Sequence, residues 1–443
     1  MNHDIEETLI RCPKGHDNPD GSPECIECGL PLVACDRGIN HLLQRMVEKT
    51  DYVVPHINGS FLGVGAKGSK VISDFYDLFA DEVQGLSFLK IGSAESMAGV
   101  PQIHPRGARF YQYAISGTVA GGTIYCGFGE KSASGDSRLE SYLHMSGIRD
   151  DDAGQTIFIA ASFGGGMGSG AAPVMANLCK KLNSEISVLS IVTMPSDSEA
   201  DHAHLNAFYG ISRLITFEGK PNADMILLLN HDRLRHIRGV GRSGEDLQAD
   251  NVVTYLLRLF ELNLHRSGII RACRISRGAK IQVFVPCLAI GRSLEIFGNL
   301  ANVLESAGVY PLANVDFDKV ISSYLILRIP EGLSGDFSEG KVAEEFEAWN
   351  RRHLPAVASS LVQVLQTGEQ SDRVDACILL GGDELGDMIG ENIDGYHRFK
   401  ASLEKSSQWE EYGLSEKISA EAERVITNHD DSLQILRKSR MSS

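Results

Sequence analysis

The sequence predicts an α/β protein built on a mostly parallel β-sheet, and three observations support this. From residue 56 onward, short apolar runs typical of buried strands alternate with segments of helical periodicity. The segment 245–266 is apolar on most sides, which predicts a long helix buried between two domains. Beyond it, further alternation of strand and helix predicts a second, smaller α/β domain.

Strands and helices are predicted in alternation along the chain. In the first half the apolar run INGSFLGVG precedes the helical VISDFYDLF, TIFIAASF precedes APVMANLCKKL, and ISVLSIVTM precedes ADHAHLNAFYGISRLI, with the strand DMILLLN after these. In the second half we expect strands at KIQVFVPCLAIG, SYLILRIP and DACILLGG, with helices near 294–307 and near 340–366 between them. The polar tail from about residue 400 predicts surface helices.

Composition narrows the class of protein. Hydrophobic residues make up 43% and charged residues 23%, as in soluble globular proteins. The net charge of −16 opposes nucleic acid or an anionic membrane surface as the main partner. There is no run of 18 apolar residues, and the acidic N-terminus lacks a secretory h-region, so we expect a cytoplasmic protein without a membrane span.

Four of the nine cysteines lie in the first 35 residues, and the other five have apolar neighbours. The pattern CxxxHxxxxxxxxCxxC in CPKGHDNPDGSPECIEC combines thiolates and imidazole, which zinc prefers, and NPDGSP supplies a turn between the two pairs. We therefore predict a structural Zn²⁺ site in a zinc ribbon over 1–34, which would dock an unknown protein partner. Its ligands would be Cys12, His16, Cys25 and Cys28, whereas Cys35 lies outside the pattern.

A glycine-rich segment, FGGGMGSGAAP (163–173), follows the predicted strand TIFIAAS and precedes a helix. Glycines there allow the backbone to approach phosphate closely, and the amides at the helix start attract negative charge. The segment is not a Walker loop, because no GK[ST] follows. It also differs from the dinucleotide fingerprint, which opens the first strand–helix unit.

GGGMGSG resembles the signature loop GGGTG[ST]G of the tubulin/FtsZ superfamily, and the likeness extends over nearly the whole chain beyond residue 56. FLGVGAKGSKVISDF (61–75) resembles the first phosphate loop, and AGG (120–122) the third, which helps enclose the γ-phosphate. PSDSEADHAHLNAFYGISRL (195–214), LLLNHDRL (227–234) and ADNVV (249–253) resemble later segments in the same order. YPLANVDFDKVISSYLILRIPEG (310–332) resembles an FtsZ C-terminal segment.

The resemblance implies a site for GTP or GDP, with Mg²⁺ accompanying the nucleotide. Glu199 would touch the ribose, while Asn230 and Asp250 would hydrogen-bond the guanine edge. The residues implied in nucleotide binding are Gly65, Ala66, Lys67, Gly68, Ser69, Lys70, Gly121, Gly122, Gly164, Gly165, Gly166, Met167, Gly168, Ser169, Gly170, Glu199, Asn230 and Asp250.

Three positions depart from the family pattern. Met167 stands where the signature threonine is expected, so a hydroxyl near the γ-phosphate is lost. Lys70 replaces an asparagine and could contribute a point charge to phosphate. Ala203 replaces an arginine. These departures leave the preference among nucleotides open.

A fourth departure concerns turnover. In the family, a loop after the central helix inserts into the neighbouring subunit's nucleotide pocket, where its carboxylates polarise the attacking water. We expect that loop at 268–276, where Arg271, Cys273 and Ser276 occupy the asparagine and acid positions. No carboxylate occurs between His265 and Gln282. An alternative is NVDFDKV (314–320) with Asp316, although it comes late in the chain and precedes a strand.

The resulting hypothesis is a guanine-nucleotide-binding, tubulin/FtsZ-like protein that forms homo-oligomers, filaments or heteromers, with weak or partner-dependent hydrolysis. Whether it is an enzyme stays open, and no catalytic residue is assigned. Alternatives are an ordinary polymerising GTPase that hydrolyses GTP at subunit interfaces, a dinucleotide-dependent metabolic enzyme, and a nucleic-acid regulator. The predicted division is a zinc ribbon at 1–34, a linker helix at 35–55, a GTP-binding domain at 56–244, the central helix at 245–267, a smaller α/β C-terminal domain at 268–399 and a helical tail at 400–443.

Overall fold

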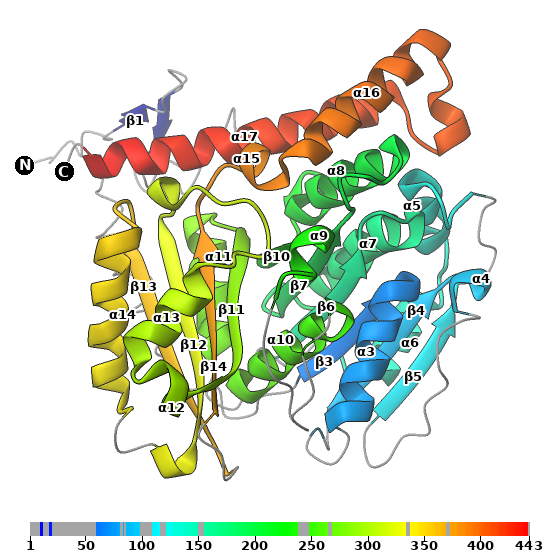
Figure 1. Cartoon of the computed structure of the whole chain (residues 1–443). Coiled ribbons are helices and arrows are strands. Elements are labelled where there is room, and N and C mark those ends of the chain that lie inside the picture. Colours follow the sequence, from blue (N-terminus) through cyan, green and yellow to red (C-terminus); the bar gives the residue numbers. More distant parts are fainter. Residues whose placement is uncertain are drawn as a thin grey trace, which may run out of the picture.

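One ten-stranded sheet organises the molecule, which is seen here in a computed structural model (Figure 1). The strand order is β13-β12-β14-β11-β10-β7-β6-β3-β4-β5. The structure describes residues 9–11, 17–19, 59–79, 83, 86–97, 109–115, 121–148, 155–237, 247, 249–264, 268–333, 337–368 and 373–441.

The first half of the sheet is entirely parallel, as the alternation of strands and helices predicts. Its strands are β3 (Gly59–Val64), β4 (Ser87–Gly92), β5 (Arg109–Ala114), β6 (Thr156–Ser162), β7 (Ser187–Met194) and β10 (Met225–Asn230). The connecting helices include α3 (Gly65–Phe79), α4 (Ala94–Met97), α5 (Cys126–Ser134), α6 (Leu139–Met145), α7 (Gly166–Leu182), α8 (Asp201–Ile215) and α9 (His231–Leu234).

Helices cover both faces of this half of the sheet. Because successive side chains of a strand point to opposite faces, each strand contributes to the cores on both sides. Phe61 and Phe158 stack at 4.7 Å between ring centroids on the face that α3 covers. Leu62 and Ile159 belong to the core on the other face, together with buried side chains of α5, α7 and α8. The near-continuous apolar runs of the sequence follow from this two-sided burial.

The second half of the sheet is mixed. β10 pairs in parallel with β11 (Val283–Ser293), so the sheet continues across the join between the halves. β14 (Arg373–Gly381) runs antiparallel to both β11 and β12 (Ser322–Pro330), while β12 and β13 (Ser359–Thr367) are parallel. Helices α12 (Leu294–Phe297), α13 (Leu300–Gly308) and α14 (Glu339–His353) accompany these strands, and residues of α13 and α14 contribute to a separate apolar core.

The helix predicted near 340–366 is wrong over its second part. α14 ends at His353, and 359–367 form strand β13 instead. Pro355 disfavours helical geometry in the preceding residue, which stops the helix. Beyond it, Leu361 and Leu365 pack on the core at one face of the strand, and Val362 and Val364 pack on the core at the other face.

The long apolar helix is α10 (Ala249–Leu264), within the range that the sequence predicts. It packs against α3 of the first half and also contacts β12 and β13 of the second half. Its last residue, Leu264, lies against Gly59 at the start of β3, where a Cβ atom on Gly59 would meet the Leu264 side chain. α11 (Gly268–Ala279) follows and leads into β11.

The C-terminal residues form a helical layer along the top edge in Figure 1. It comprises α15 (Leu385–Ile389), α16 (Glu391–Ser406), the 3₁₀ turn η3 (Trp409–Tyr412) and the 26-residue α17 (Glu416–Met441). α16 packs on α8, where the rings of Phe208 and Tyr396 stack at 3.8 Å. At the other end of α17, Arg437 donates to the carbonyl oxygen of Gly382 at 3.1 Å, so this helix links the two halves of the sheet.

In the N-terminal part, the described residues form a small antiparallel pair, β1 (Leu9–Arg11) with β2 (Asp17–Pro19). All four predicted zinc ligands and the predicted helix 35–55 lie outside the described residues. Within the part of the chain that the structure describes, no group of three or more His, Cys, Asp or Glu side chains could hold a metal ion. Across the same residues, no helix has both the length and the apolarity needed to cross a membrane.

Candidate functional site

A cavity of about 310 Å³ opens where β3 and β6 end and α3 and α7 begin. Ligands of open α/β sheets bind at this carboxyl edge, since helix N-termini and loops converge there. The cavity is lined by Val64, Gly65, Ala66, Lys67, Thr123, Ser162, Gly164, Gly165, Met167, Gly168 and Glu199. Eight of these eleven are among the residues that the sequence assigns to nucleotide binding.

The first wall is the turn from β3 into α3. Gly65 has φ +75°, a left-handed conformation that glycine adopts without steric cost. A Cβ atom on Gly68 would overlap the carbonyl oxygen of Ala160 in β6, so only glycine allows α3 to start this close to the sheet. The turn thereby exposes the backbone of Gly65, Ala66 and Lys67 to the cavity.

The second wall is the start of α7. A Cβ atom on Gly168 would overlap the carbonyl oxygen of Ser162, so the helix begins directly against the end of β6. The N-cap residue Gly165 makes no side-chain capping bond, and the amide of Gly166 donates to Thr123 O at 3.0 Å. The amides of Met167 and Gly168 have no acceptor within the helix, because they belong to its first turn. These amides, at the positive end of a 17-residue helix, favour an anion in the cavity.

Two ionisable side chains line the cavity, Lys67 from α3 and Glu199 from the segment after β7. Lys67 is exposed to solvent. The Glu199 carboxylate accepts a hydrogen bond from the amide of Ser196 at 3.2 Å, which holds it beside Gly164. Ser196 Oγ donates at 2.7 Å to Asp232 in α9, and this bond is the main cause that lowers the pKa of Asp232. The cavity therefore has a cation on one side and a fixed acid on the other.

Several predicted side chains serve the structure around the cavity. Ser69 and Ser169 are fully buried, and their hydroxyls donate to the carbonyl oxygens of Gly63 (3.1 Å) and Phe163 (2.8 Å), respectively. Met167 is only 2% exposed and contributes its side chain to the apolar core. The residue in the threonine position therefore stabilises α7 from within.

Lys70 is not among the residues that line the cavity. Its Nζ lies 2.8 Å from the carboxylate of Asp74, one helical turn further along α3, and its side chain is 50% exposed. Its predicted role as a phosphate ligand is therefore not supported by its position. Gly121 and Gly122 do not line the cavity but precede Thr123, which does. Gly166 and Gly170 pack against the backbone of the segment around α5.

The two residues predicted to bind the base, Asn230 and Asp250, lie outside the cavity lining. Asn230 ends β10, and its Oδ1 accepts from the amides of Asp232 (2.8 Å) and Arg233 (3.2 Å), capping α9. Asp250 lies in the first turn of α10, with a side chain outside what the structure describes. Neither residue is among those that line the cavity.

Val64, Thr123 and Ser162 also line the cavity, and none of them is among the residues predicted from the sequence to bind nucleotide. A signal for two of them was present, since Ser162 directly precedes the loop FGGG and Thr123 directly follows AGG. Glycine-rich loops mark the region where a phosphate would bind, and the polar residues next to them in sequence are candidates for its lining.

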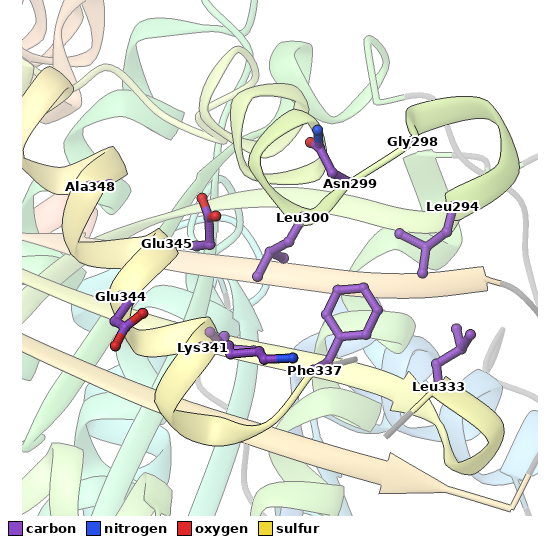
Figure 2. A pocket seen from close by; sticks show the side chains of 11 residues that line it. Leu294, Gly298, Asn299, Leu300, Leu333, Phe337, Lys341, Glu344, Glu345 and Ala348 are labelled. Carbon is purple, nitrogen blue, oxygen red and sulfur yellow. The ribbon is translucent and has the colours of Figure 1, made fainter. Parts of the chain in front are cut away.

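A larger cavity of about 590 Å³ lies between α12, α13 and α14 (Figure 2). Its labelled side chains include Leu294, Leu300, Leu333 and Phe337, with Glu344 and Glu345 on α14. A mostly apolar lining with two carboxylates would repel phosphate, despite the presence of Lys341. We therefore take the smaller, glycine-walled cavity as the candidate functional site.

Comparison with known proteins relates part of the chain to one protein family. Residues 144–239 match the family model described as Tubulin/FtsZ family, GTPase domain. The cell division protein FtsZ of Porphyromonas gingivalis is 28% identical over 193 residues, which are 43% of this chain and 36% of that protein. FtsZ 2 of Pyrococcus furiosus is 27% identical over 184 residues, 40% of this chain and 41% of that protein. The chain thus matches about two fifths of the length of these curated relatives.

Solved structures extend the likeness to most of the chain. The GDP-bound monomer of CetZ1 from Haloferax volcanii superposes with a TM-score of 0.61 and 16% identity, covering 77% of this chain and 99% of CetZ1. CetZ2 from the same organism, as a GTPγS-bound protofilament, gives 0.58 and 18%, covering 79% and 99%. The chain has the tubulin/FtsZ fold. This confirms the predicted fold class for the part of the chain that these structures cover.

In this tubulin/FtsZ fold, the segment expected to form a catalytic interface loop is instead a helix. Residues 268–276 belong to α11, where Cys273 and Ser276 are buried. Ser276 Oγ donates to Ala272 O at 2.8 Å, and burial raises the pKa of the Cys273 thiol well above its usual value. The prediction of a loop there is wrong, because the apolar residues Ile269, Ala272 and Cys273 follow a helical period against the core.

Asp316 is also misplaced for supplying an acid to a neighbour. It caps the 3₁₀ turn η1 (Phe317–Lys319), and its own amide donates to Asp383 at 2.7 Å. The preceding Leu312 accepts from the amide of Asn230 at the carboxyl end of β10, which is the same edge of the sheet as the cavity. The end of α10, beside the start of β3, lies at the opposite edge.

Proposed function

We propose that this protein binds a guanine nucleotide in the glycine-walled cavity, assembles with other copies or a related chain, and hydrolyses the nucleotide slowly or only with a partner. The observation that carries the proposal is the double backbone wall formed by Gly65–Lys67 and by the start of α7, which suits phosphate and leaves no room for larger side chains. Related structures described as GDP-bound and GTPγS-bound support the choice of nucleotide.

In this proposal the phosphates lie against the amides of Met167 and Gly168, with Lys67 as a further cation and Mg²⁺ as counter-ion. Glu199 would accept from the ribose hydroxyls. Asn230 would use its remaining NH₂ group towards the base, while its Oδ1 caps α9. Asp250, in the first turn of α10, would complete guanine recognition from the other side.

The proposed assembly depends on the positions of two regions, the cavity and the end of α10. The cavity is at the carboxyl end of β3, and the end of α10 is beside the amino end of the same strand. Copies stacked along this direction would bring the start of α11, with Arg271 in its first turn, towards the next copy's cavity. An arginine there could pair with phosphate but could not act as a base. The structures described as an FtsZ dimer and a CetZ2 protofilament support stacking of this kind.

Calorimetry with GTP, GDP and ATP in the presence of Mg²⁺ tests the binding proposal. We expect GTP and GDP to bind and ATP to bind at least tenfold more weakly, since a buried polar group without its partner costs about 1–3 kcal/mol. Equal affinity for ATP and GTP would remove guanine recognition from the proposal. The absence of binding by any nucleotide would overturn it.

The zinc ribbon remains part of the proposal as a docking module for a partner. Elemental analysis of protein purified without added metal should find one zinc per chain. A Cys25→Ser/Cys28→Ser variant should lose the metal, and nucleotide affinity should be unaffected, since the cavity is built from other residues. Stoichiometric zinc in that variant would contradict the proposed ligands.

A further inference from the structure

Asn206, on the second turn of α8, is fully buried and makes three hydrogen bonds to two different loops. Its Oδ1 accepts from the amide of Cys126 at 2.9 Å. Its Nδ2 donates to the carbonyl oxygens of Ile124 at 2.6 Å and Gly164 at 3.0 Å. A primary amide can make four such bonds, so this side chain is nearly saturated by backbone groups.

The Cys126 amide is the first of α5, whose N-cap residue Tyr125 provides no side-chain bond. Asn206 therefore caps α5 from another helix, satisfying an amide that helix geometry leaves open. The same side chain holds the 121–125 turn, through Ile124, and the 163–165 turn, through Gly164. One residue thus fixes three elements relative to one another.

Both turns reach the cavity, the first through Thr123 and the second through Gly164 and Gly165. A backbone bond from Gly166 N to Thr123 O, at 3.0 Å, joins them at the cavity itself. The contact is tight, because a Cβ atom on Gly166 would lie 2.6 Å from both Gly122 O and Tyr125 N. The position of Thr123 therefore depends on how the 121–125 turn is held against α7.

We propose that Asn206 is a positioning residue that sets the cavity's preference for a nucleoside triphosphate over shorter nucleotides. This rests on the proposed nucleotide binding. Thr123 of the 121–125 turn lines the cavity, and the resemblance of 120–122 to the loop that helps enclose the γ-phosphate implies that the terminal phosphate would contact this turn. The phosphates nearer the nucleoside would contact α7 and the Gly65–Lys67 turn. Asn206 touches no ligand and acts only through the backbone that it fixes.

The test compares GMP, GDP and GTP affinities, by calorimetry with Mg²⁺ at fixed salt, for wild type, Asn206→Asp and Asn206→Ser. Aspartate has nearly the same shape but cannot donate and would face two carbonyl oxygens. Serine is too short to reach all three partners. We expect GTP affinity to fall about tenfold or more, GDP affinity less, and GMP affinity to stay within about twofold, because the loss grows with contact to the displaced turn.

Asn222→Asp is the matched control. Asn222 is also buried, and its Nδ2 donates to the carbonyl oxygens of Pro173 (2.9 Å) and Arg213 (3.0 Å), joining α7 to α8 away from the cavity. It should lower the melting temperature like the Asn206 variants while changing all three affinities equally. An equal proportional loss for GMP and GTP in the Asn206 variants would overturn the inference alone. No nucleotide binding by wild type would overturn the proposed function and the inference with it.

Hydrogen–deuterium exchange on wild type keeps the inference testable if the variants do not fold. The amides of 121–129 should exchange more slowly with GTP than with GMP bound, because the terminal phosphate would stabilise the turn that Asn206 holds. Equal protection by the two nucleotides would contradict a role of this turn in binding the terminal phosphate.

Discussion

The regions at the two ends of β3 differ in the groups that they offer to a nucleotide. At its carboxyl end, Gly65 and the start of α7 form a cavity whose walls are mostly backbone, with Lys67 and Glu199 as its ionisable side chains. Near its amino end, Leu264 ends α10 and α11 follows after a short connection, without a carboxylate between His265 and Gln282. The closest acid on the chain before them, Glu261, is buried and paired with Arg258.

This contrast indicates that nucleotide binding and nucleotide hydrolysis depend on different parts of the molecule. Binding phosphate requires correctly placed amides, and the glycines that allow this are present. Phosphoryl transfer to water also requires a group that orients the water, and its absence costs orders of magnitude in rate. The segment from 266 to 281, which the proposed stacking would bring towards a neighbour's nucleotide, therefore contains no acid that could orient the water.

The largest expected effect comes from filling the cavity wall. Gly168→Val should abolish measurable GTP binding, because even a Cβ atom there overlaps Ser162 O and the start of α7 must move. Gly332→Val is the control, since nothing lies within 4 Å of a Cβ atom at that position. Calorimetry and thermal melts of both variants check this. Retained GTP affinity in a folded Gly168→Val protein would show that the nucleotide binds elsewhere.

A smaller effect is expected from the cavity's cation. Lys67→Ala should weaken GTP binding by about fivefold, roughly 1 kcal/mol, and more at low than at high salt, because an exposed charge is screened. Lys70→Ala removes the same charge from the next turn, where the lysine pairs with Asp74 outside the cavity, and should change GTP affinity less than twofold. The reverse order of the two effects would mean that α3 presents Lys70 to the phosphates.

The smallest effect should come from Asp316→Ala. Loss of its cap on η1 should lower the free energy of unfolding by about 0.5–1 kcal/mol. The rate of phosphate release should stay within about twofold of wild type, because Asp316 lies on the cavity's own edge of the sheet and caps a turn there. Loss of GTP turnover in this variant would place the catalytic acid in the 314–320 segment after all.

The fold could be predicted from the sequence because it depends on local signals, and eight residues predicted to bind nucleotide line the cavity, although their binding role stays a prediction. Close backbone contacts require glycine at 68 and 168, a positive φ favours it at 65, and these requirements are visible in the residue type itself. Alternating apolar runs likewise report two-sided burial of parallel strands. The resemblance to tubulin and FtsZ added the order of the loops.

Side-chain roles were predicted less well, because residue type does not reveal direction. Ser69, Ser169 and Met167 occupy signature positions yet point into the interior, and Lys70 turns outward to Asp74. Asn206 was missed because its three partners are backbone groups on distant segments, which no local pattern reports. The predicted helix 340–366 includes the strand 359–367 because α14 directly precedes this strand, with Pro355 as the local signal of the break between them.

Phosphate release from GTP at high protein concentration, measured with the amount of bound nucleotide, tests the central claim most directly. We expect stoichiometric bound GTP and release on the order of one phosphate per chain per hour or slower. The rate should depend little on protein concentration, because the segment 266–281 that stacking would bring to the cavity contains no acid. Brisk release that rises with protein concentration would show that a neighbouring copy completes the site, and would contradict the separation of binding from turnover.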